Sequence, residues 1–232
     1  MPVAKPKALI VGASRGLGLA MAEEYLSRGW DVVGTVRGNG RTALHDLKDK
    51  HGAALQIESV DIIEQDQIAA LRERLAGQTF DLLFVNSGVA NGPGEAVGSI
   101  STDEFIRVMV TNALGPMRVI AALDDLVTPT GTIGVMSSGL GSVGDNEDGG
   151  WEVYRGSKAA LNTFMRSYAA EHRKGGRSLV IISPGWVRTD MGGPHATLDV
   201  SESIPRVVDV IAAQSGKRGL SYLNYMGKTV RW

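Results

Sequence analysis

The sequence predicts an α/β fold: a doubly wound, mostly parallel sheet of seven strands with helices on both faces. Apolar segments typical of buried strands alternate along the chain with segments of helical spacing. The strand segments also lack period-two alternation, which indicates a sheet covered on both faces. With 232 residues, 43% hydrophobic and 21% charged, the chain suits one domain, residues 1–232, with a large core.

The first half of the chain contains four predicted strands and three predicted helices. Residues 8–11 form a short apolar run that stops at glycine, and residues 17–28 follow with apolar side chains at helical spacing. The later elements continue this alternation, with a strand at 31–36, a helix at 42–51, a strand at 55–60, a helix at 65–75 and a strand at 80–85.

The second half continues with longer helices. Residues 102–126 are predicted to be helical, with a break near Gly115-Pro116, because proline lacks the N–H donor of a helix interior. The polar, glycine-rich stretch 141–150 is predicted to be a loop within the domain. The remaining elements are a strand at 131–136, a helix at 152–173, a strand at 178–182, a helix at 203–214 and a strand at 220–223.

Composition and charge exclude several classes of function. With 24 Lys+Arg against 25 Asp+Glu and a net charge of -1, nothing indicates a nucleic-acid partner. The absence of cysteine excludes disulfides and thiolate nucleophiles, and the four histidines show no ligand spacing, so we expect no metal. The apolar run after the basic start is too short for a signal or a membrane span, so we expect a cytoplasmic protein without membrane association.

A glycine-rich turn, Gly12-Ala-Ser-Arg-Gly16-Leu-Gly18, follows the first strand and opens the first helix. Glycine permits the tight turn and lets backbone N–H groups approach a pyrophosphate, while the helix N-terminus adds free donors and partial positive charge. A plain glycine turn between strand and helix is the alternative. The position favours a phosphate site made by Gly12, Ser14, Arg15, Gly16, Leu17 and Gly18.

Two arginines indicate a preference for NADP(H) over NAD(H). In a Rossmann-type sheet the end of the second strand meets the adenosine ribose, where an acidic residue would bind the 2′-hydroxyl of NAD. This chain has Arg37 there, and Arg15 lies in the glycine turn, so two guanidiniums can clamp a 2′-phosphate. A solvated surface charge is the alternative for either. Asp61, beside Ile62, either accepts a hydrogen bond from the adenine amino group or caps the third helix.

Residues 154–158, Tyr-Arg-Gly-Ser-Lys, place a phenol and an ammonium one turn apart on one face of a helix. A phenol titrates near pH 10 in water, and a fixed positive charge nearby lowers that pKa. The pair is therefore a plausible proton donor near neutral pH. Tyr-x-x-x-Lys alone is a weak signal, but with the glycine turn it is strong.

Together these motifs resemble the short-chain dehydrogenase/reductase family of the single-domain type. The resemblance runs from Gly12 to at least Met191 and includes Asp61, Asn86-Ser-Gly88 and Asn112. Within the family, residues 137–142, 154–162 and 184–193 are similar to the C-factor and Sniffer-like carbonyl reductases.

The resemblance implies a role for each matching residue. Tyr154 would protonate the carbonyl oxygen as hydride arrives, and Ser138 would hydrogen-bond and polarise that oxygen. Lys158 would hold the nicotinamide ribose and lower the tyrosine pKa, and Asn112 would anchor a water in a proton relay. The cofactor would also be contacted by Asp61, Ile62, Asn86, Ser87, Gly88, Pro184, Gly185, Val187 through its backbone, and Thr189.

The chain departs from the family pattern at three places. Ser87 stands where alanine is usual, and Ser138 precedes Tyr154 by 16 residues, so the loop 141–150 looks lengthened. Ser137 and Ser142 compete with Ser138 for the catalytic role. The segment Gly192–Ser203 is short for a substrate lid, which indicates an open pocket for varied or bulky carbonyls. Trp151, Trp186, Leu140 and Met191 either line that pocket or only pack in loops and core.

The expected function is NADPH-dependent reduction of an aldehyde or ketone to an alcohol, or the reverse. A non-catalytic or signalling protein that binds NADP(H) on the same fold is one alternative. An epimerase or dehydratase is another, although little chain is left for a larger substrate region. The family often forms homodimers or homotetramers through helices 102–126 and 152–173, while some members are monomers. Met165, Tyr168 and Ala169 would either form such an interface or face the sheet.

Overall fold

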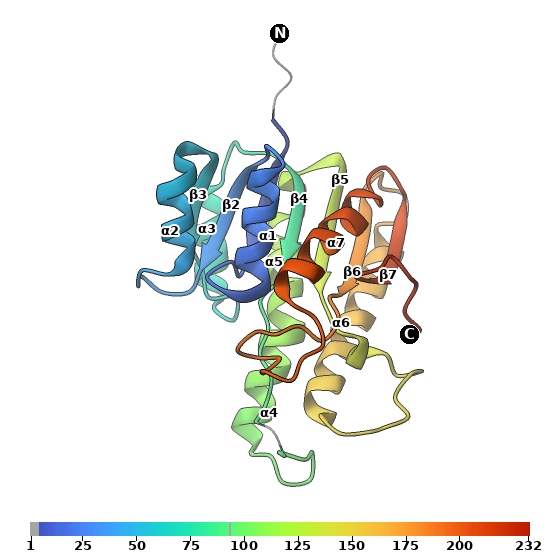
Figure 1. Cartoon of the computed structure of the whole chain (residues 1–232). Helices are drawn as coiled ribbons and strands as arrows, with labels where there is room; N and C mark the ends of the chain where they lie inside the picture. The colour runs from blue at the N-terminus through green and yellow to red at the C-terminus, as the bar shows by residue number, and fades with distance from the viewer. Residues whose placement is uncertain (1–4, 93) are drawn as a thin grey trace.

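The sheet contains seven strands in the order β3-β2-β1-β4-β5-β6-β7, and every neighbouring pair is parallel. The structure is a computed structural model that describes residues 5–92 and 94–232 (Figure 1). The strands are β1 (Lys7–Val11), β2 (Asp31–Val36), β3 (Leu55–Ser59), β4 (Phe80–Val85), β5 (Val127–Met136), β6 (Ser178–Ser183) and β7 (Gly219–Asn224). The predicted α/β fold with a doubly wound sheet is confirmed, and the sheet is parallel throughout.

Helices cover both faces of this sheet. Their bounds are α1 (Gly16–Ser27), α2 (Ala43–His51), α3 (Gln65–Arg74), α4 (Thr102–Met109), α5 (Gly115–Leu123), α6 (Glu152–Glu171) and α7 (Val200–Ala212). Buried side chains of α1, α2 and α7 pack on one face, and those of α3, α5 and α6 pack on the other (Figure 1). Successive residues of β1 alternate between these two cores, so Leu9 belongs to one and Ile10 to the other. Burial on both faces explains why the strands are uniformly apolar.

The predicted helix 102–126 is interrupted earlier than expected. A π-helical segment, Val110–Leu114, separates α4 from α5, and a short 3₁₀ turn, Asp124–Leu126, follows α5. Gly115-Pro116 does not break the helix but begins α5, because the first turn of a helix needs no N–H from proline. The stretch Thr102–Leu126 is long and apolar enough to cross a membrane by composition. In the structure 44% of its 18-residue apolar window is buried, and Val119 and Ile120 pack in the core beside the sheet.

Several other element ends differ from the prediction, most of them by one residue. Strand β5 begins at Val127 rather than 131, with a register shift opposite Phe80 that accommodates the extra residues. Helix α7 begins at Val200 rather than 203, because Asp199 and Glu202 form a capping box. Helix α6 ends at Glu171 rather than 173.

The outer face of α4 to α6 carries exposed apolar side chains, but not those considered from the sequence. Met165 and Tyr168 are buried in the core, and Ala169 packs against it, so these three face the sheet. The large exposed apolar residues on these helices and the π-helical segment are Phe105, Ile106, Leu114 and Phe164.

Candidate active site

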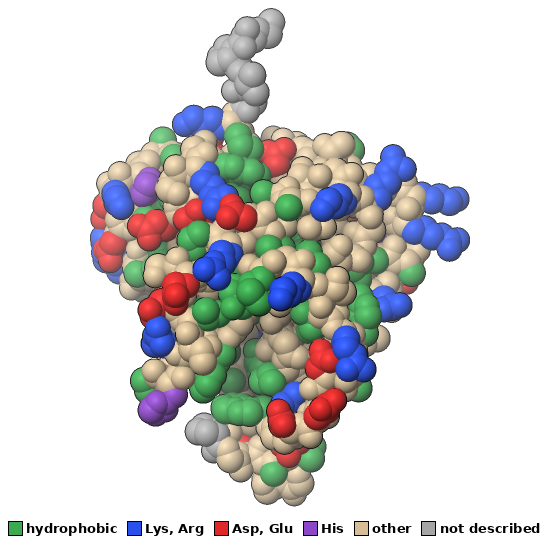
Figure 2. All heavy atoms as spheres, turned by 45° about the vertical axis from the view of Figure 1, so that its right-hand side comes forward, with side chains coloured by type: hydrophobic (Ala, Val, Ile, Leu, Met, Phe, Trp, Pro, Cys, Tyr) green, Lys and Arg blue, Asp and Glu red, His purple; other side chains and the backbone are tan. Residues whose placement is uncertain are grey.

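The predicted site residues come together at one edge of the sheet. They lie just after the carboxyl ends of β1 to β6, in the first turns of α1 and α6 or in the segment Val110–Leu114, and parallel strands present their carboxyl ends at the same edge. This edge is the lower one in Figure 1, and hydrophobic side chains gather around a hollow on the same side in Figure 2. The strand order reverses between β1 and β4, which is where open α/β sheets bind ligands.

The glycine-rich turn brings the start of α1 into contact with the end of β1. Gly12 and Gly16 have φ angles of 89° and 58°, a region that other residues rarely adopt. A Cβ atom on Gly18 would lie 2.0 Å from the Gly12 carbonyl oxygen, so only glycine allows this approach. The half-buried Ser14 and Leu17 belong to the same turn. Arg15 is the N-cap but makes no capping bond with its side chain, which leaves the first N–H groups of α1 open to an anion.

Side chains from the neighbouring strands hold this turn in place. Asn86 Nδ2 donates a hydrogen bond to the Gly12 carbonyl at 2.9 Å, and the Gly12 N–H donates to Thr35 Oγ1 at 3.0 Å. Ser87 Oγ would lie 2.3 Å from a Cβ atom on Gly12, so serine is accommodated because residue 12 has no side chain. Sequence reasoning assigned no role to Thr35, although a hydroxyl in the apolar β2 was a usable signal.

Arg15 and Arg37 both lie at the surface beside the glycine turn. Arg37 directly follows β2 and is exposed. Arg15 Nη1 lies 3.3 Å from Asp190 Oδ2, and about four-fifths of each of these two side chains is exposed, 77% and 81%. Exposed ion pairs contribute little to stability, so Arg15 can exchange Asp190 for a phosphate at little cost.

Asp61 and Ile62 follow β3. Asp61 Oδ1 accepts a hydrogen bond from the Ile63 N–H at 3.3 Å. The N-cap of α3 is Glu64, so the alternative that Asp61 caps this helix is wrong. Ile62 packs in the hydrophobic core. A contact from Asp61 to adenine stays a prediction.

Tyr154 and Lys158 lie on the face of α6 that meets the ends of β4 and β5. Lys158 is 3% exposed, and its Nζ donates a hydrogen bond to the Met136 carbonyl at 2.9 Å. Nζ also lies 5.9 Å from the centroid of the Tyr154 ring. Burial lowers the pKa of Lys158 to about 8, because the charged form loses its hydration.

The phenol pKa differs from the prediction. Burial raises the pKa of Tyr154, and the Ser138 hydroxyl, a hydrogen-bond partner of the phenol, acts in the opposite direction. The predicted lowering of the phenol pKa is therefore wrong for this structure, because desolvation of the phenolate is the largest influence on Tyr154 and Lys158 Nζ lies 5.9 Å from the ring centroid. Tyr154 is accordingly a neutral hydrogen-bond donor at neutral pH.

Ser138 lies at the end of β5 and caps a short 3₁₀ turn, Gly139–Gly141. Its Oγ accepts a hydrogen bond from the Leu140 N–H at 3.1 Å and faces the Tyr154 phenol. The two competing serines make other contacts. Ser137 Oγ donates to Asn162 Oδ1 at 2.7 Å, and Ser142 Oγ accepts from the Asp145 N–H at 3.1 Å. These contacts favour Ser138 as the serine available to a substrate.

Asn112 lies in the π-helical segment and is completely buried. Its Oδ1 accepts a hydrogen bond from the Val89 N–H at 2.8 Å, and its Nδ2 donates to the Val89 carbonyl at 2.7 Å and to Ser157 Oγ at 2.9 Å. A Cβ atom on Gly88 would lie 3.2 Å from Lys158 Nζ and 3.4 Å from Asn112 Oδ1. The structure thus brings Gly88, Asn112 and Lys158 together, and π-helical segments are frequent at functional sites.

The segment after β6 folds back on itself beside the glycine turn. Ser203 Oγ donates to the Pro184 carbonyl at 2.7 Å, and Val187 forms a bridge with Leu198. Gly185 has a φ of 85°, which permits its close approach to Leu198. Thr189 Oγ1 accepts a hydrogen bond from the Gly192 N–H at 3.1 Å, and its methyl group lies within 3.9 Å of a Cβ position on Gly16.

Three supporting residues were not found from the sequence. Ser157 connects Asn112 to the Tyr154 carbonyl. Asn162 Nδ2 donates to the Gly141 carbonyl at 3.1 Å, and the Tyr222 hydroxyl donates to the Ser138 carbonyl. Asn162 had a signal, because it lies one helical turn beyond Lys158 on the face that already carries Tyr154. Tyr222, 84 residues from Ser138, had none.

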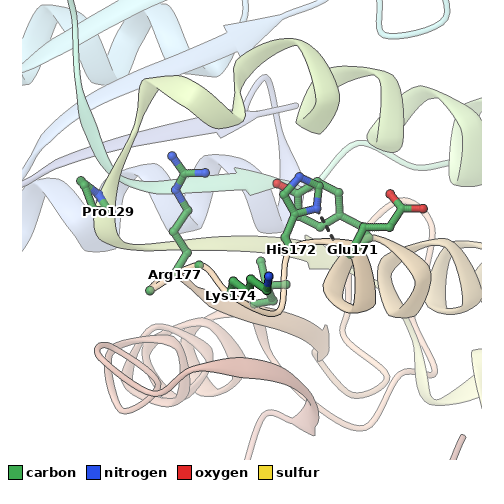
Figure 3. A pocket seen from close by; sticks show the side chains of 9 residues that line it. Pro129, Glu171, His172, Lys174 and Arg177 are labelled. Atoms are coloured by element: carbon green, nitrogen blue, oxygen red, sulfur yellow. Dashed lines mark hydrogen bonds between the residues drawn. The ribbon is translucent and has the colours of Figure 1, made fainter.

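A pocket of about 440 Å³ lies at the opposite end of the sheet, where α6 ends and β5 and β6 begin. His172 stacks on Tyr168 with their ring centroids 4.0 Å apart, and Arg177 and Lys174 border the opening (Figure 3). None of the predicted site residues lines this pocket. It is therefore separate from the site at the carboxyl edge.

Comparison with known proteins identifies the family. A sequence model described as "short chain dehydrogenase" matches residues 6–197. The C-signal protein of Myxococcus xanthus is 37% identical over 154 residues, which are 66% of this chain and 92% of that protein.

Two solved structures extend the likeness over almost the whole chain. A Burkholderia multivorans protein described as a short-chain dehydrogenase/reductase, with bound NADP, has a TM-score of 0.97 at 57% identity and covers 99% of this chain and 100% of its own. The carbonyl reductase Sniffer of Drosophila melanogaster has a TM-score of 0.91 at 29% identity, with coverage of 99% and 100%. The predicted resemblance is confirmed, and the chain belongs to the short-chain dehydrogenase/reductase family of oxidoreductases.

Proposed function

We propose that this oxidoreductase reduces an aldehyde or ketone to an alcohol, or catalyses the reverse, with NADP(H) as the hydride carrier. The observation that carries this proposal is the convergence of three groups at the carboxyl edge of the sheet. The Ser138 hydroxyl lies at the Tyr154 phenol, and the buried Lys158 lies beneath the same ring. A polarising hydroxyl and a proton donor side by side fit a carbonyl oxygen that gains negative charge.

The residues present fit a dinucleotide phosphate cofactor. A Cβ atom on Gly18 would collide with the Gly12 carbonyl, so the turn keeps its backbone N–H groups accessible to a pyrophosphate. Arg15 and Arg37 would hold the 2′-phosphate, and Asn86 to Gly88 would border the cleft beyond β4. When bound, NADP(H) supplies or accepts the hydride.

The remaining steps belong to side chains of this chain. Ser138 would donate a hydrogen bond to the carbonyl oxygen, and Tyr154 would transfer its phenol proton to that oxygen. Lys158, held by the Met136 carbonyl, would supply the positive charge that stabilises the phenolate left behind. Asn112 holds the Val89 backbone, and so fixes the chain segment that follows β4 and passes Lys158.

The pKa directions favour reduction near neutral pH. Because burial raises the pKa of Tyr154, the phenol carries its proton and acts as an acid. Because the pKa of Lys158 is about 8, this residue is mostly charged at pH 7. Alcohol oxidation needs the phenolate as a base, so we expect it to gain rate toward alkaline pH while reduction does not.

Exposed apolar side chains near the site support bulky carbonyls as substrates. Trp151 precedes the catalytic turn of α6, and Trp186 and Met191 lie in the segment after β6. All three keep 41% to 53% of their surface exposed, although the Trp186 ring is tied to the Gly192 carbonyl through Nε1. Large apolar groups exposed beside a cleft are typical of a site for small apolar molecules.

The test is a fluorescence titration with NADPH and NADH, followed by a panel of aldehydes, ketones and quinones read at the nicotinamide absorbance. We expect tighter binding of NADPH and turnover that is lost in Tyr154→Phe, while NADPH binding is kept. Arg37→Ala should weaken NADPH binding more than NADH binding, because only NADPH carries the 2′-phosphate. Arg218→Ala, at an exposed arginine beside β7, is the matched control. Equal binding of both nucleotides would refute the cofactor preference.

A signalling role is the second candidate, because a relative at 37% identity is named C-signal. Tyr154→Phe separates the two functions. If a cellular phenotype of gene deletion is rescued by Tyr154→Phe, carbonyl reduction does not account for the biological role.

We also propose a homodimer or homotetramer, with the monomer as the outcome that would refute it. The exposed Phe105, Ile106, Leu114 and Phe164 on α4, the π-helical segment and α6 provide an apolar surface for pairing. Light scattering decides the matter, because a single protomer has a mass of 24.6 kDa.

A further inference from the structure

Tyr222 of β7 holds the backbone that carries Ser138. The Tyr222 side chain is 2% exposed, and its hydroxyl donates a hydrogen bond to the Ser138 carbonyl. Burial raises the pKa of Tyr222 to about 12, so the hydroxyl stays a donor across the working range of the protein. The sheet ladder itself ends one residue earlier, with the hydrogen bond from the Ser137 N–H to the Ile182 carbonyl at 2.8 Å. The Ser138 carbonyl therefore accepts from the Tyr222 side chain and, at 2.9 Å, from the Gly141 N–H of its own turn, and not from a neighbouring strand.

The far end of the same turn is also held by a side chain. Asn162 of α6 donates to the Gly141 carbonyl at 3.1 Å and accepts a hydrogen bond from Ser137 Oγ at 2.7 Å. A Cβ atom on Gly141 would lie 2.9 Å from Lys158 Cβ, so the turn is pressed against the helix that carries Tyr154. Asn162 from α6 and Tyr222 from β7 thus hold the two ends of the 138–141 turn, and their side chains also contact each other.

The segment Thr229–Trp232 extends this support to the next residues of the loop. Thr229 pairs with Leu223, and the Trp232 ring lies 5.5 Å from the Tyr222 ring, measured between centroids. The Gly144 N–H donates to the Trp232 backbone oxygen at 2.8 Å, and Arg231 pairs with Asp145 at 3.2 Å.

Gly144 lies close to the Trp232 backbone, and the Trp232 ring packs against α6. A Cβ atom on Gly144 would lie 2.9 Å from the Trp232 oxygen, so glycine is needed for this contact. The Arg166 guanidinium lies 4.5 Å from the centroid of the Trp232 ring, which fixes the indole on α6.

We propose that Tyr222 is a positioning residue for Ser138 and that Thr229–Trp232 holds the 142–145 part of the same loop. The inference rests on the proposed carbonyl reduction. Tyr222 touches neither substrate nor cofactor in this scheme and acts through the turn that carries the serine, because its hydroxyl also contacts the side chains of Ser137 and Asn162. A displacement of about 1 Å in a catalytic group can lower a rate by up to ~10²-fold. Loss of one hydrogen bond at the turn is therefore expected to lower kcat on the order of tenfold, since the Asn162 end remains held.

The test compares Tyr222→Phe with Tyr225→Phe in the full-length protein. Tyr225 lies three residues further along, and its hydroxyl makes no hydrogen bond to any residue that the structure describes. We expect Tyr222→Phe to lower kcat on the order of tenfold while KM for the carbonyl and the affinity for NADPH change little, and Tyr225→Phe to leave kcat unchanged.

A double-mutant cycle separates positioning from general loosening of the fold. In a Ser138→Ala background, Tyr222→Phe should add no further loss of kcat, because its effect runs through the missing hydroxyl. If the double variant instead loses kcat by the product of the two single losses, the proposal is overturned. Hydrogen exchange offers a readout without turnover: amides 139–144 should exchange faster in Tyr222→Phe and Trp232→Ala than in Tyr225→Phe. Equal exchange in all three would also overturn it.

The outcomes distinguish this inference from the proposed function. Suppose that the wild-type protein turns over no carbonyl, while Tyr222→Phe still speeds hydrogen exchange at amides 139–144. This result would refute the proposed reaction and the catalytic part of the inference. Turnover that depends on Tyr154 and Ser138 but is unchanged in Tyr222→Phe would refute the inference and leave the reaction standing.

Discussion

Replacing Lys158 by methionine should stabilise the cofactor-free protein at neutral pH. The pKa of this lysine falls from 10.5 to about 8 on burial, so the folded state carries a penalty for keeping it charged. At about 1.36 kcal/mol per pH unit, this penalty is roughly 3 kcal/mol. Methionine has a similar length and no charge, but it leaves the Met136 carbonyl without its partner, which costs about 1 kcal/mol. The net gain at pH 7 is therefore about 2 kcal/mol.

The pH dependence gives this prediction its sign. Below pH 8 both the folded and unfolded lysine are charged, and the wild-type protein bears the full penalty. Between pH 8 and 10.5 only the unfolded state holds the proton, so wild-type stability rises with pH. We expect the stability advantage of Lys158→Met to shrink from about 2 kcal/mol at pH 7 to about zero near pH 10, because the penalty for a charged, buried Lys158 disappears over this range.

Urea unfolding at pH 7, 8, 9 and 10 measures this difference. Lys174→Met, at an exposed position, is the control, and its difference from the wild type should not change with pH. Two results would refute the argument that Lys158 is charged and desolvated in the folded protein. Lys158→Met would be less stable than the wild type at pH 7, or its stability would differ from the wild type by the same amount at every pH. Either variant can be unfolded without substrate or cofactor, so the result is independent of the reaction.

Three further predictions concern other positions. Asn112→Ala should lower the free energy of unfolding by roughly 3 kcal/mol in urea, because it removes three hydrogen bonds and leaves the Val89 N–H and carbonyl unpaired in the interior. A loss below about 1 kcal/mol would contradict this account. Gly18→Ala should abolish NADPH binding, because its Cβ atom would lie 2.0 Å from a carbonyl oxygen, whereas Gly40→Ala, with nothing within 4 Å, should bind normally in the same titration. Trp151→Gly should raise KM for bulky carbonyls without lowering Tm, because residue 151 has a φ of 54° that glycine adopts freely; an unchanged KM would remove Trp151 from the pocket.

Local patterns predicted most of the fold and the positions of the candidate site. Strands β2 and β4 have their predicted bounds, since each is a mainly apolar run that ends at a polar residue, Arg37 or Asn86. The edge that gathers Gly12, Asn86 and Ser138 follows from parallel strands alone.

What could not be predicted depends on contacts between distant residues. The start of β5 at Val127 depends on the register shift opposite Phe80, and the π-helical segment depends on pairing between Asn112 and Val89. The phenol pKa was predicted in the wrong direction, because neighbouring charges can be read from spacing and burial cannot. Tyr222 carries no local pattern that connects it to Ser138.

The π-helical segment Val110–Leu114 has a consequence for how the gene can change. Such a segment holds one residue more than an α-helix of the same extent, which is what an inserted codon produces. Removing one codon would let the chain continue as an ordinary α-helix, and each residue of that helix turns by about 100°. The asparagine amide would then point away from the Val89 backbone, while the apolar face against the sheet could largely re-form. If Asn112 serves the proposed reaction, a single in-frame deletion would turn this enzyme into a folded, inactive descendant.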